Sequence, residues 1–455
     1  MVKVKTNDLK NAVEQSLISS DYSKVSLKTD GNTLKVGSFN YESFYEEYAN
    51  GDYCNVYENY LSISIDVVEK DSDLETLILR DDLLNTINSI KSEYVSLFIQ
   101  KDKTKYFEYA YYLIINDGKK DYHLPAQNPD LVKSFVDKRL VQKDIENGVK
   151  IKTKVLIDAI DKVIYATHDG NYFLVRKTIG LIFKDNKLFL AGTSENRTAV
   201  YDLKAKSSYR SKKYGIVKLN GRGGITKTAA LTIKKVFSSS EYILLDIVNE
   251  GEYIVAIFKS GNIMLTTKII KEDVYPDVFE TINSLNNKHT IQAKLPKNTI
   301  IDTLKHIILV ETERRKKYAN QKVLYHISQK ENICVTLLFS NNNLNIKGTV
   351  FDKGVDVDIE YIGNAIENEY VVDLDALDLI KTLSNIHTDK IIITFSPEDK
   401  LPAYISSTDS KYSVVIKPHY VEKAKKSMEA VWNTKCRDIG WYGTSFFSWN
   451  TILHD

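Results

Sequence analysis

The segment of this sequence with the clearest potential for chemistry is glycine-rich, Gly221-Arg222-Gly223-Gly224-Ile225-Thr226-Lys227-Thr228. Placed between a strand and a helix, such a segment resembles a phosphate-binding loop. That loop needs glycine immediately before its lysine, because the backbone must wrap around the phosphates. Thr226 occupies that position. We therefore interpret the segment as a glycine-rich turn before a helix.

Histidine, cysteine and carboxylate residues form no further catalytic pattern. The eight histidines are scattered, and neither the HExxH nor the GxSxG pattern occurs. Cys54, Cys334 and Cys436 are far apart and odd in number, which argues against a disulfide framework or a zinc site and favours a reducing compartment. The pair Asp81-Asp82 falls where a helix should begin and would stabilise the helix dipole. The sequence thus predicts no enzyme, no metal and no cofactor.

Length and composition limit the class of protein. The 455 residues suffice for about three domains of ~150 residues. The formal net charge of +2 means that a nucleic-acid surface would have to come from the placement of charges. The N-terminus lacks the apolar stretch of a signal peptide, and no run of ~18 apolar residues occurs. We expect a cytoplasmic protein without a membrane span, from a bacterium or from a virus inside its host.

A helical pattern recurs three times along the chain. Apolar residues spaced three and four positions apart begin near Thr6, Thr153 and Lys297, at intervals of about 147 and about 144 residues. A second helical pattern follows in each repeat, over residues 82–90, 227–237 and 375–386. Strand-like runs follow these helices or lie between the two helices, over residues 94–99, 179–183, 187–191, 242–247, 335–339 and 390–395.

Each repeat therefore predicts two helices packed on mostly antiparallel sheet, an α+β layer. The expected domains are 1–144, 145–290 and 291–421, followed by an aromatic tail, 422–455. Helices on one face of each sheet would line one surface of any arc that the repeats form, with the strands facing outward.

Basic residues lie on the helices of all three repeats. A single lysine on a helix is ordinarily just solvated, but the set as a whole suits neutralisation of the phosphates of duplex DNA. No recognition helix, zinc finger or RNA-binding aromatic motif argues for base reading. The residues in question are Lys3, Lys5, Lys10, Lys91, Lys101, Lys103, Lys105, Lys152, Lys154, Lys162, Lys227, Lys234, Lys235, Lys297, Lys305, Arg314, Arg315, Lys316 and Lys317.

Several motifs resemble one family in their order along the chain. Residues 171–200, which include Thr193-Ser194-Glu195-Asn196-Arg197-Thr198, are similar to the middle domain of the bacterial DNA polymerase III beta subunit, the sliding clamp. Tyr275-Pro276-Asp277 resembles the Phe-Pro-Asp that closes that domain. Further likenesses occur at Tyr122-His123-Leu124-Pro125, Asn287-Lys288-His289, 372–383 and 412–421, so that the resemblance spans about 420 residues.

The resemblance implies a head-to-tail homodimer whose six domains form a closed ring, with helices inside and sheets outside. Such a ring holds DNA by topology, is opened by a clamp loader and tethers a DNA polymerase. The family's DNA-touching loop maps to Tyr172, Arg176 and Lys177. With the helix residues, the expected DNA-binding set is Lys10, Lys154, Tyr172, Arg176, Lys177, Lys227, Lys234, Lys235, Lys305, Arg314 and Arg315.

Two further sites follow from the resemblance. The subunit interface maps to Tyr122 and Leu124 of the first domain and to Leu309 and Val310 of the third, although all four suit a core equally well. The pocket for partner peptides, more polar here than in the family, maps to Thr178, Thr193, Asn196, Arg197, Thr198, Pro276, Thr281, Val415, Lys417, Pro418 and His419.

The chain continues for 34 residues beyond Val421, where the family's sequence ends, and this tail holds all three tryptophans, Trp432, Trp441 and Trp449. It would either dock on a clamp face or partner pocket, or cover its own subunit. Two alternatives to a polymerase clamp stay open. One is a clamp-like regulatory or structural protein that tethers transcription or repair factors to DNA. The other is a DNA-modifying enzyme, for which no catalytic residues are evident.

Overall fold

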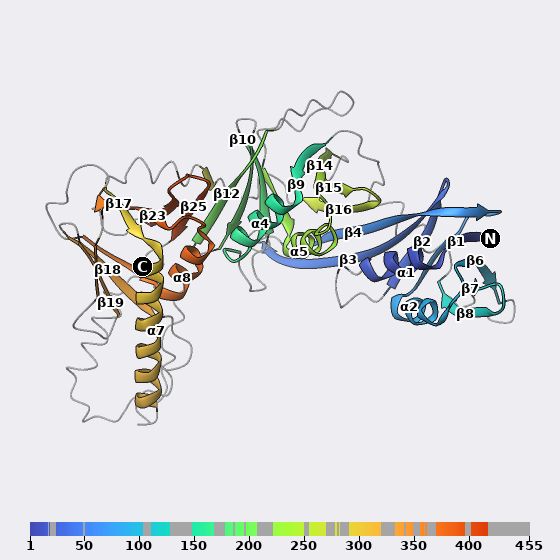
Figure 1. Cartoon of the computed structure of the whole chain (residues 1–455), viewed down its shortest axis with the longest axis horizontal. Helices are drawn as coiled ribbons and strands as arrows, with labels where there is room; N and C mark the ends of the chain where they lie inside the picture. Colours follow the sequence, from blue (N-terminus) through green and yellow to red (C-terminus); the bar gives the residue numbers. More distant parts are fainter. Residues whose placement is uncertain are drawn as a thin grey trace. The chain divides into compact units, whose positions relative to one another are not determined.

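The computed structural model describes residues 1–16, 18, 24–48, 51–102, 111–127, 148–167, 178–184, 187–194, 197–206, 222–249, 254–269, 278–279, 282, 291–319, 333–340, 343–348, 355–358, 360–361, 370–395 and 402–416. The chain divides into two units. Figure 1 labels their helices and strands. Unit 1 comprises residues 1–288, 385–391 and 404–415, and unit 2 the remainder. The three-domain division expected from the sequence stays a prediction.

The first ten elements of unit 1 form a closed arrangement of strands with two helices. Two strand groups, in the orders β1-β6-β7-β8 and β5-β2-β3-β4, are joined by pairing of β1 with β4 and of Ile78 in β5 with Ala126 in β8. The elements are β1 (Val2–Lys5), α1 (Thr6–Gln15), β2 (Lys24–Asp30), β3 (Thr33–Tyr48), β4 (Gly51–Lys70), β5 (Glu75–Leu79), α2 (Arg80–Ser89), β6 (Tyr94–Lys101), β7 (Tyr111–Asn116) and β8 (Asp121–Ala126).

The next ten elements repeat this order of strands and helices. Their strands pair in the orders β9-β14-β15-β16 and β13-β10-β11-β12, position for position the pattern of the first ten. The elements are β9 (Val149–Lys152), α4 (Thr153–Ile164), β10 (Thr178–Lys184), β11 (Lys187–Thr193), β12 (Arg197–Lys206), β13 (Arg222–Thr226), α5 (Lys227–Val236), β14 (Tyr242–Asn249), β15 (Ile254–Ser260) and β16 (Ile263–Ile269).

The remaining elements follow the same order once more, with one additional strand, β21. In unit 2 the strands pair in the orders β22-β18-β19-β20 and β23-β17-β21. The elements are β17 (Ile291–Pro296), α7 (Lys297–Ala319), β18 (Cys334–Ser340), β19 (Asn343–Gly348), β20 (Val355–Asp358), β21 (Glu360–Tyr361), β22 (Tyr370–Asp375), α8 (Ala376–Asn385), β23 (Lys390–Phe395), β24 (Ala403–Ser407) and β25 (Tyr412–Ile416). Strand β25 continues the β13-β10-β11-β12 group of unit 1, followed by β24.

These three successive sets of elements are called runs here. The fourth strand of one run pairs with the eighth strand of the next run. β4 pairs with β16, from Asn59↔Thr267 to Ile63↔Ile263. Asn59 is fully buried at this joint, where its side chain bonds the hydroxyls of Thr226 at 3.2 Å and Thr267 at 2.7 Å. The Thr226 hydroxyl also accepts a hydrogen bond from the Ala229 amide, so it caps α5. This buried network therefore ties the joint to the start of a helix.

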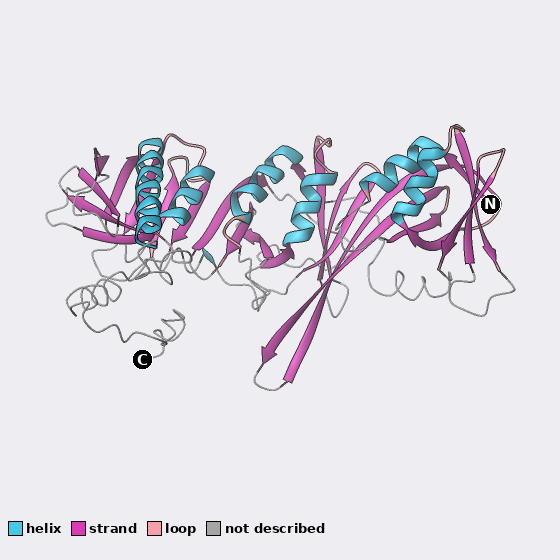
Figure 2. Ribbon diagram, turned by 90° about the horizontal axis from the view of Figure 1, so that it is seen from below, coloured by secondary structure: helices cyan, strands magenta, loops and turns pink. Residues whose placement is uncertain are grey.

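The helices begin where the periodicity predicts. α1, α4 and α7 start at Thr6, Thr153 and Lys297, and the buried faces of α1 and α4 carry the expected apolar residues, such as Leu9 and Leu156. In unit 1 the helices α1, α2, α4 and α5 lie along one side of the strands (Figure 2). Acidic Asp81 and Asp82 occupy the first turn of α2, as expected. The α+β character predicted from the sequence is confirmed.

One feature differs from the sequence-based expectation, and two others were not indicated by the sequence. The segment interpreted as a glycine-rich turn forms strand β13, because Gly223 and Gly224 pair with Leu181 and Gly180 of β10. Helix α7 has 23 residues, about twice the length of α1 or α4. The β3–β4 hairpin is far longer than any other in the described part of the chain. Within the same residues, no helix is long and apolar enough to cross a membrane.

Candidate functional site

The predicted DNA-binding lysines of unit 1 lie on its helices. Lys154 on α4 and Lys235 on α5 are exposed, whereas Lys10 on α1 and Lys227 on α5 are half-buried. Lys234 on α5 forms an ion pair with Asp161 on α4. The α4/α5 pair thus carries cations at the surface, and the Lys234–Asp161 ion pair joins the two helices.

The two helix pairs of unit 1 differ in charge. Helices α4 and α5 carry five basic residues against two acidic ones, namely Lys154, Lys162, Lys227, Lys234 and Lys235 against Asp158 and Asp161. Helices α1 and α2 carry two basic residues against four acidic ones, namely Lys10 and Arg80 against Asp8, Glu14, Asp81 and Asp82. Phosphate attraction should therefore come mainly from α4 and α5, which makes Lys10 the weakest member of the predicted set.

In unit 2 the basic candidates lie on α7. The Lys305 side chain is 63% exposed, with its Nζ 3.7 Å from an Asp302 carboxylate oxygen one turn earlier. Arg314 and Arg315 belong to the last part of the same helix. Over its full length α7 carries six basic residues against three acidic ones. The mapped loop residues Tyr172, Arg176 and Lys177 lie outside the described residues.

The mapped peptide-pocket residues divide into buried and accessible ones. Thr178, Thr193 and Val415 are buried, with exposed fractions of 0%, 7% and 6%. Arg197 and Thr198, at the start of β12, are half-buried, and the Thr198 hydroxyl lies 3.0 Å from that of Thr193. A ligand would therefore meet Arg197 and Thr198 first. Asn196, Pro276, Thr281, Lys417, Pro418 and His419 lie outside the described residues.

Arg197 is held by a tyrosine cluster of unit 1 that the sequence did not indicate. Its Nη2 donates to the Tyr165 carbonyl at 2.7 Å, and its guanidinium carbon lies 5.3 Å from the centre of the Tyr165 ring. The Tyr412 hydroxyl lies 2.9 Å from the Tyr165 hydroxyl and 2.9 Å from the Lys162 carbonyl oxygen. These contacts join the end of α4, β12 and β25 and fix the guanidinium direction before any ligand arrives.

The same cluster shifts the titration of its tyrosines. Burial, followed by the charge of Asp158 and the hydrogen bond to it, raises the pKa of Tyr201 to about 12. The Tyr201 hydroxyl donates to Asp158 Oδ2 at 3.1 Å. Burial and the neighbouring Tyr165 raise the pKa of Tyr412 well above its usual value. Both phenols are therefore neutral donors at physiological pH and serve structure and recognition more readily than proton transfer.

Gly192 in β11 allows the strand to approach α4 closely beside this cluster. A β-carbon at Gly192 would lie 2.1 Å from the Val163 carbonyl oxygen, a distance that no side chain tolerates. Glycine is therefore required here by backbone-to-backbone packing and not by an unusual φ angle. It sits directly before Thr193, so it positions the β11 end of the predicted pocket.

The predicted interface residues lie at β8 and α7. Tyr122 and Leu124 of β8 are half-buried, and the Tyr122 hydroxyl donates to Asp117 Oδ2 at 3.3 Å. On α7, Val310 is half-buried, whereas Leu309 is 60% exposed. The alternative that all four are core residues is therefore wrong for Leu309.

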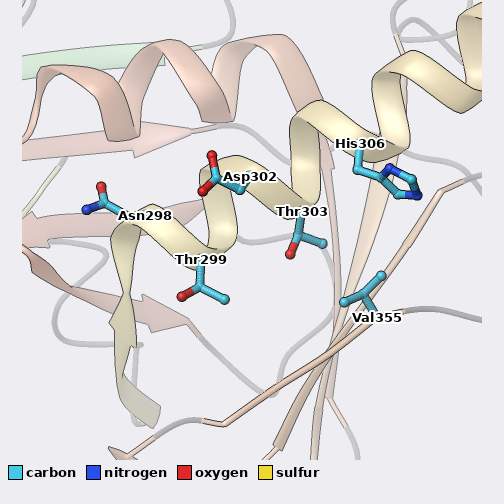
Figure 3. Close-up of a pocket in the computed structure, with 6 residues that line it drawn as sticks. All are labelled: Asn298, Thr299, Asp302, Thr303, His306 and Val355. Atoms are coloured by element: carbon cyan, nitrogen blue, oxygen red, sulfur yellow. The ribbon is translucent and has the colours of Figure 1, made fainter.

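A shallow open groove in unit 2 lies along the first part of α7. In Figure 3, Asn298, Thr299, Asp302, Thr303 and His306 line it from α7, and Val355 of β20 lines it from the facing strand. Val355 is 40% exposed although it is apolar. Sequence reasoning missed this groove, because β20 is short and the pairing that brings it against α7 is not local.

The polar groups of these sites can be described by the ligands that they suit. Within the described ranges no group of three or more His, Cys, Asp or Glu residues could hold a metal ion. The polar groups that converge are an arginine, threonine hydroxyls and neutral phenols, which suit hydrogen bonding to a polar ligand or peptide.

Comparison with known proteins identifies the fold. No family model matches the sequence, and neither does any curated protein. The solved DNA polymerase sliding clamp of Caulobacter crescentus matches with a TM-score of 0.64 at 14% identity, over 92% of this chain and 99% of that one. The DNA polymerase III beta subunits of Pseudomonas aeruginosa and Thermotoga maritima match with TM-scores of 0.65 and 0.62 at 13% and 12% identity, over 92% of this chain and 99% and 98% of theirs. The chain has the fold of these bacterial sliding clamps.

Proposed function

We propose that this protein is a DNA sliding clamp, a non-catalytic ring subunit that encircles duplex DNA and tethers a DNA polymerase. In this proposal the three runs of elements are three clamp domains, and two subunits form the ring. The observation that carries the proposal is the recurring pairing of a fourth strand with an eighth strand. The chain makes this pairing twice, and among the described strands one further fourth strand and one further eighth strand lack it.

The two joints inside the chain are β4 with β16 and β12 with β25. By the same rule, the fourth strand of the third run, β20, and the eighth strand of the first run, β8, each lack such a partner among the described strands. A second copy placed head to tail would pair its β8 with β20 and its β20 with β8. Such heterologous contacts close into a ring when the rotation permits.

Exposed apolar residues near these strands support the same contact. Leu309 is 60% exposed and Val355 is 40% exposed, and both lie on the α7 and β20 side of unit 2. Burial of such residues is the usual driving force for subunit association. The α7–β20 groove would receive side chains from the partner's β8 region.

The charges on the helices support a sequence-independent contact with DNA. The α4/α5 pair and α7 each carry three more basic than acidic residues. A ring that holds DNA by topology needs only weak phosphate attraction, because tight binding would impede sliding. In this proposal Lys154, Lys235 and Lys305 face the DNA.

The tyrosine cluster supports a docking site for a peptide of the polymerase or of a clamp loader. Arg197, held by Tyr165, would donate to peptide carbonyls or carboxylates, and Thr198 would line the same surface. The polar character of these residues implies a peptide with more hydrogen-bonding groups than a purely apolar motif.

The test combines subunit mass with retention on DNA. The wild-type chain should run at about twice 52.0 kDa, remain on nicked circular DNA and leave it when the circle is linearised. Leu309→Glu should weaken the dimer by ~100-fold, because it places a charge in an apolar contact. Val371→Glu is the matched control, since Val371 of β22 is 56% exposed but lies away from the proposed contact.

Three outcomes contradict parts of the proposal. A wild-type monomer that stays on circular DNA excludes the two-subunit ring. Equal effects of Leu309→Glu and Val371→Glu exclude the α7 contact. A ring that slides on DNA but does not lengthen the run of any DNA polymerase favours the regulatory tether instead.

A further inference from the structure

The β3–β4 hairpin extends well beyond the sheet to which it belongs. The two strands pair without interruption from Thr33↔Asp66 to Tyr48↔Gly51. β2 accompanies β3 only as far as Ser38, and β16 accompanies β4 only from Asn59 onward. Residues 41–48 and 51–58, called the ribbon here, therefore form a two-stranded arm with no further strand on either edge in the described residues. It leaves unit 1 on the side away from the helices (Figure 2).

The repeated topology shows that the fold does not require this arm. The hairpin at the same position of the second run joins β11 of 7 residues to β12 of 10 residues. In the first run the corresponding strands have 16 and 20 residues. The ribbon is thus an addition to a framework that is complete without it.

The composition of the ribbon is unlike that of the rest of the chain. Between residues 41 and 58 there is no Lys, Arg or His, although the whole chain has 62 Lys and Arg residues against 60 Asp and Glu residues. The ribbon holds five acidic residues, Glu42, Glu46, Glu47, Asp52 and Glu58. It also holds six aromatic ones, Tyr41, Phe44, Tyr45, Tyr48, Tyr53 and Tyr57. These counts indicate a negatively charged arm in a chain of formal charge +2.

The register places these two kinds of residue opposite each other. Tyr41 pairs with Glu58, and Glu46 pairs with Tyr53. Glu47 pairs with Asp52 in the same register. An isolated two-stranded hairpin is at best marginally stable in water. A partner that adds to the ribbon would supply a third strand.

The charge also decides which partner fits. Carboxylates repel the phosphates of nucleic acids and anionic lipid surfaces. They attract lysine and arginine, whose cations also bind favourably over aromatic rings. A strand edge that has no neighbouring strand, as in the described part of the chain here, offers backbone amide and carbonyl groups to an extended chain.

We propose that the ribbon docks an extended, Lys/Arg-rich segment of a partner protein, which adds to it as a strand. This proposal goes beyond the clamp function and does not depend on it. The simplest competing explanation is that the carboxylates only keep a long hairpin from aggregating, and this explanation predicts no binding.

The test uses the full-length protein and a fluorescein-labelled 14-residue peptide of alternating Lys and Thr. Two variants change the ribbon. One replaces residues 41–58 with Asn-Gly, which shortens the hairpin toward the length of β11–β12. The other neutralises the five ribbon carboxylates through Glu42→Gln, Glu46→Gln, Glu47→Gln, Asp52→Asn and Glu58→Gln. The matched control neutralises five exposed carboxylates of the body through Asp8→Asn, Glu14→Gln, Asp66→Asn, Asp71→Asn and Asp81→Asn.

Fluorescence anisotropy should show that both ribbon variants bind the peptide at least ~10-fold more weakly than wild type, while the body control binds within about twofold. Binding should weaken as salt rises. A peptide with proline in place of three threonines should also bind more weakly, because proline removes strand donors. Amide exchange over residues 40–58 should slow when the Lys-Thr peptide binds.

Two results would overturn the proposal. Undiminished binding by the shortened variant, or no binding by wild type, would mean that the ribbon is not the docking site. Equal binding of the proline-containing peptide, with no slowing of amide exchange, would mean that the contact is general charge attraction and not strand addition.

Discussion

Strands β8 and β16 hold the same position in two successive runs but differ in their surroundings. β16 pairs with β4 over Ile263–Thr267, and all five residues of that stretch are buried. Among the described strands, β8 pairs on its second side only at Ala126, and the rest of the strand alternates between exposed and half-buried residues. It also contains Pro125, a residue that strands tolerate mainly at edges.

Burial of the eighth strand therefore depends on the strand that pairs with its second side, and not on the fold of its own run. Both strands follow the same hairpin geometry with the preceding strand, since β15–β16 and β7–β8 are antiparallel pairs of similar length. The five β16 residues that pair with β4 are apolar residues or threonines. Those of β8 are amphipathic, which suits an edge whose partner comes from another molecule.

Matched proline substitutions in β16 and β8 should give the largest difference in stability between the two strands. Counted from the hairpin turns, Thr266 of β16 and Leu124 of β8 occupy equivalent positions. Thr266→Pro should lower the free energy of unfolding by about 3 kcal/mol or more, because it disrupts a buried ladder between two strands. Leu124→Pro should cost only ~1 kcal/mol in the monomer but abolish the dimer. Urea unfolding and light scattering measure the two effects.

Equal losses of stability in the two proline variants would show that β8 is as constrained as β16 within one chain. A Leu124→Pro protein that remains dimeric would place the subunit contact elsewhere.

Local features of the fold were predictable from the sequence. The starts of α1, α4 and α7 and strands such as β23 follow from apolar spacing and neighbouring residues, and the structure confirms them. It was predictable for the same reason which helices carry basic residues. Lys234 was recognised as a surface cation, but its ion pair with Asp161 required knowledge of which two helices meet.

Features that depend on distant pairing were not predictable. The glycine-rich segment 221–228 has the local signature of a turn, yet Gly223 and Gly224 are strand residues because β10 pairs with them. Tyr165, Arg197 and Tyr412 are brought together from three separate elements. The length of the β3–β4 hairpin could not be predicted either, since its acidic residues have low strand propensity.

The buried asparagine of the β4–β16 joint should give the next largest effect. Asn59→Ala should lower the free energy of unfolding by about 2 kcal/mol, because it removes the buried hydrogen bonds of the Asn59 side chain to the hydroxyls of Thr226 and Thr267. The matched control is Asn262→Ala, since Asn262 donates to the Ser64 carbonyl at 2.8 Å across the same joint but is exposed. The control should cost less than ~1 kcal/mol. Chemical denaturation of both variants measures these losses. Equal losses in the free energy of unfolding would mean that burial does not determine how much the hydrogen bonds of Asn59 stabilise the protein.

The second internal joint, β12 with β25, should differ from the first in its response to alkaline pH. The pKa of Tyr201 is raised to about 12, chiefly by burial and then by Asp158. Because the folded-state pKa lies above that of the unfolded chain, Tyr201 contributes stability that is complete below about pH 10 and is lost as the pH rises through 12. Tyr201→Phe should remove a pH dependence on the order of 1 kcal/mol, a value kept small by solvent screening.

Urea midpoints of wild type and Tyr201→Phe at pH 9 and pH 11 measure that dependence. Wild type should lose more stability than the variant between the two values. Because burial is the larger cause of the shift, Asp158→Asn should keep most of the wild-type dependence. If Tyr201→Phe follows the wild-type curve, then Tyr201 ionises as readily in the folded protein as in the unfolded one. The joint would in that case tolerate a charged phenol, which a buried strand contact does not allow without a compensating cation.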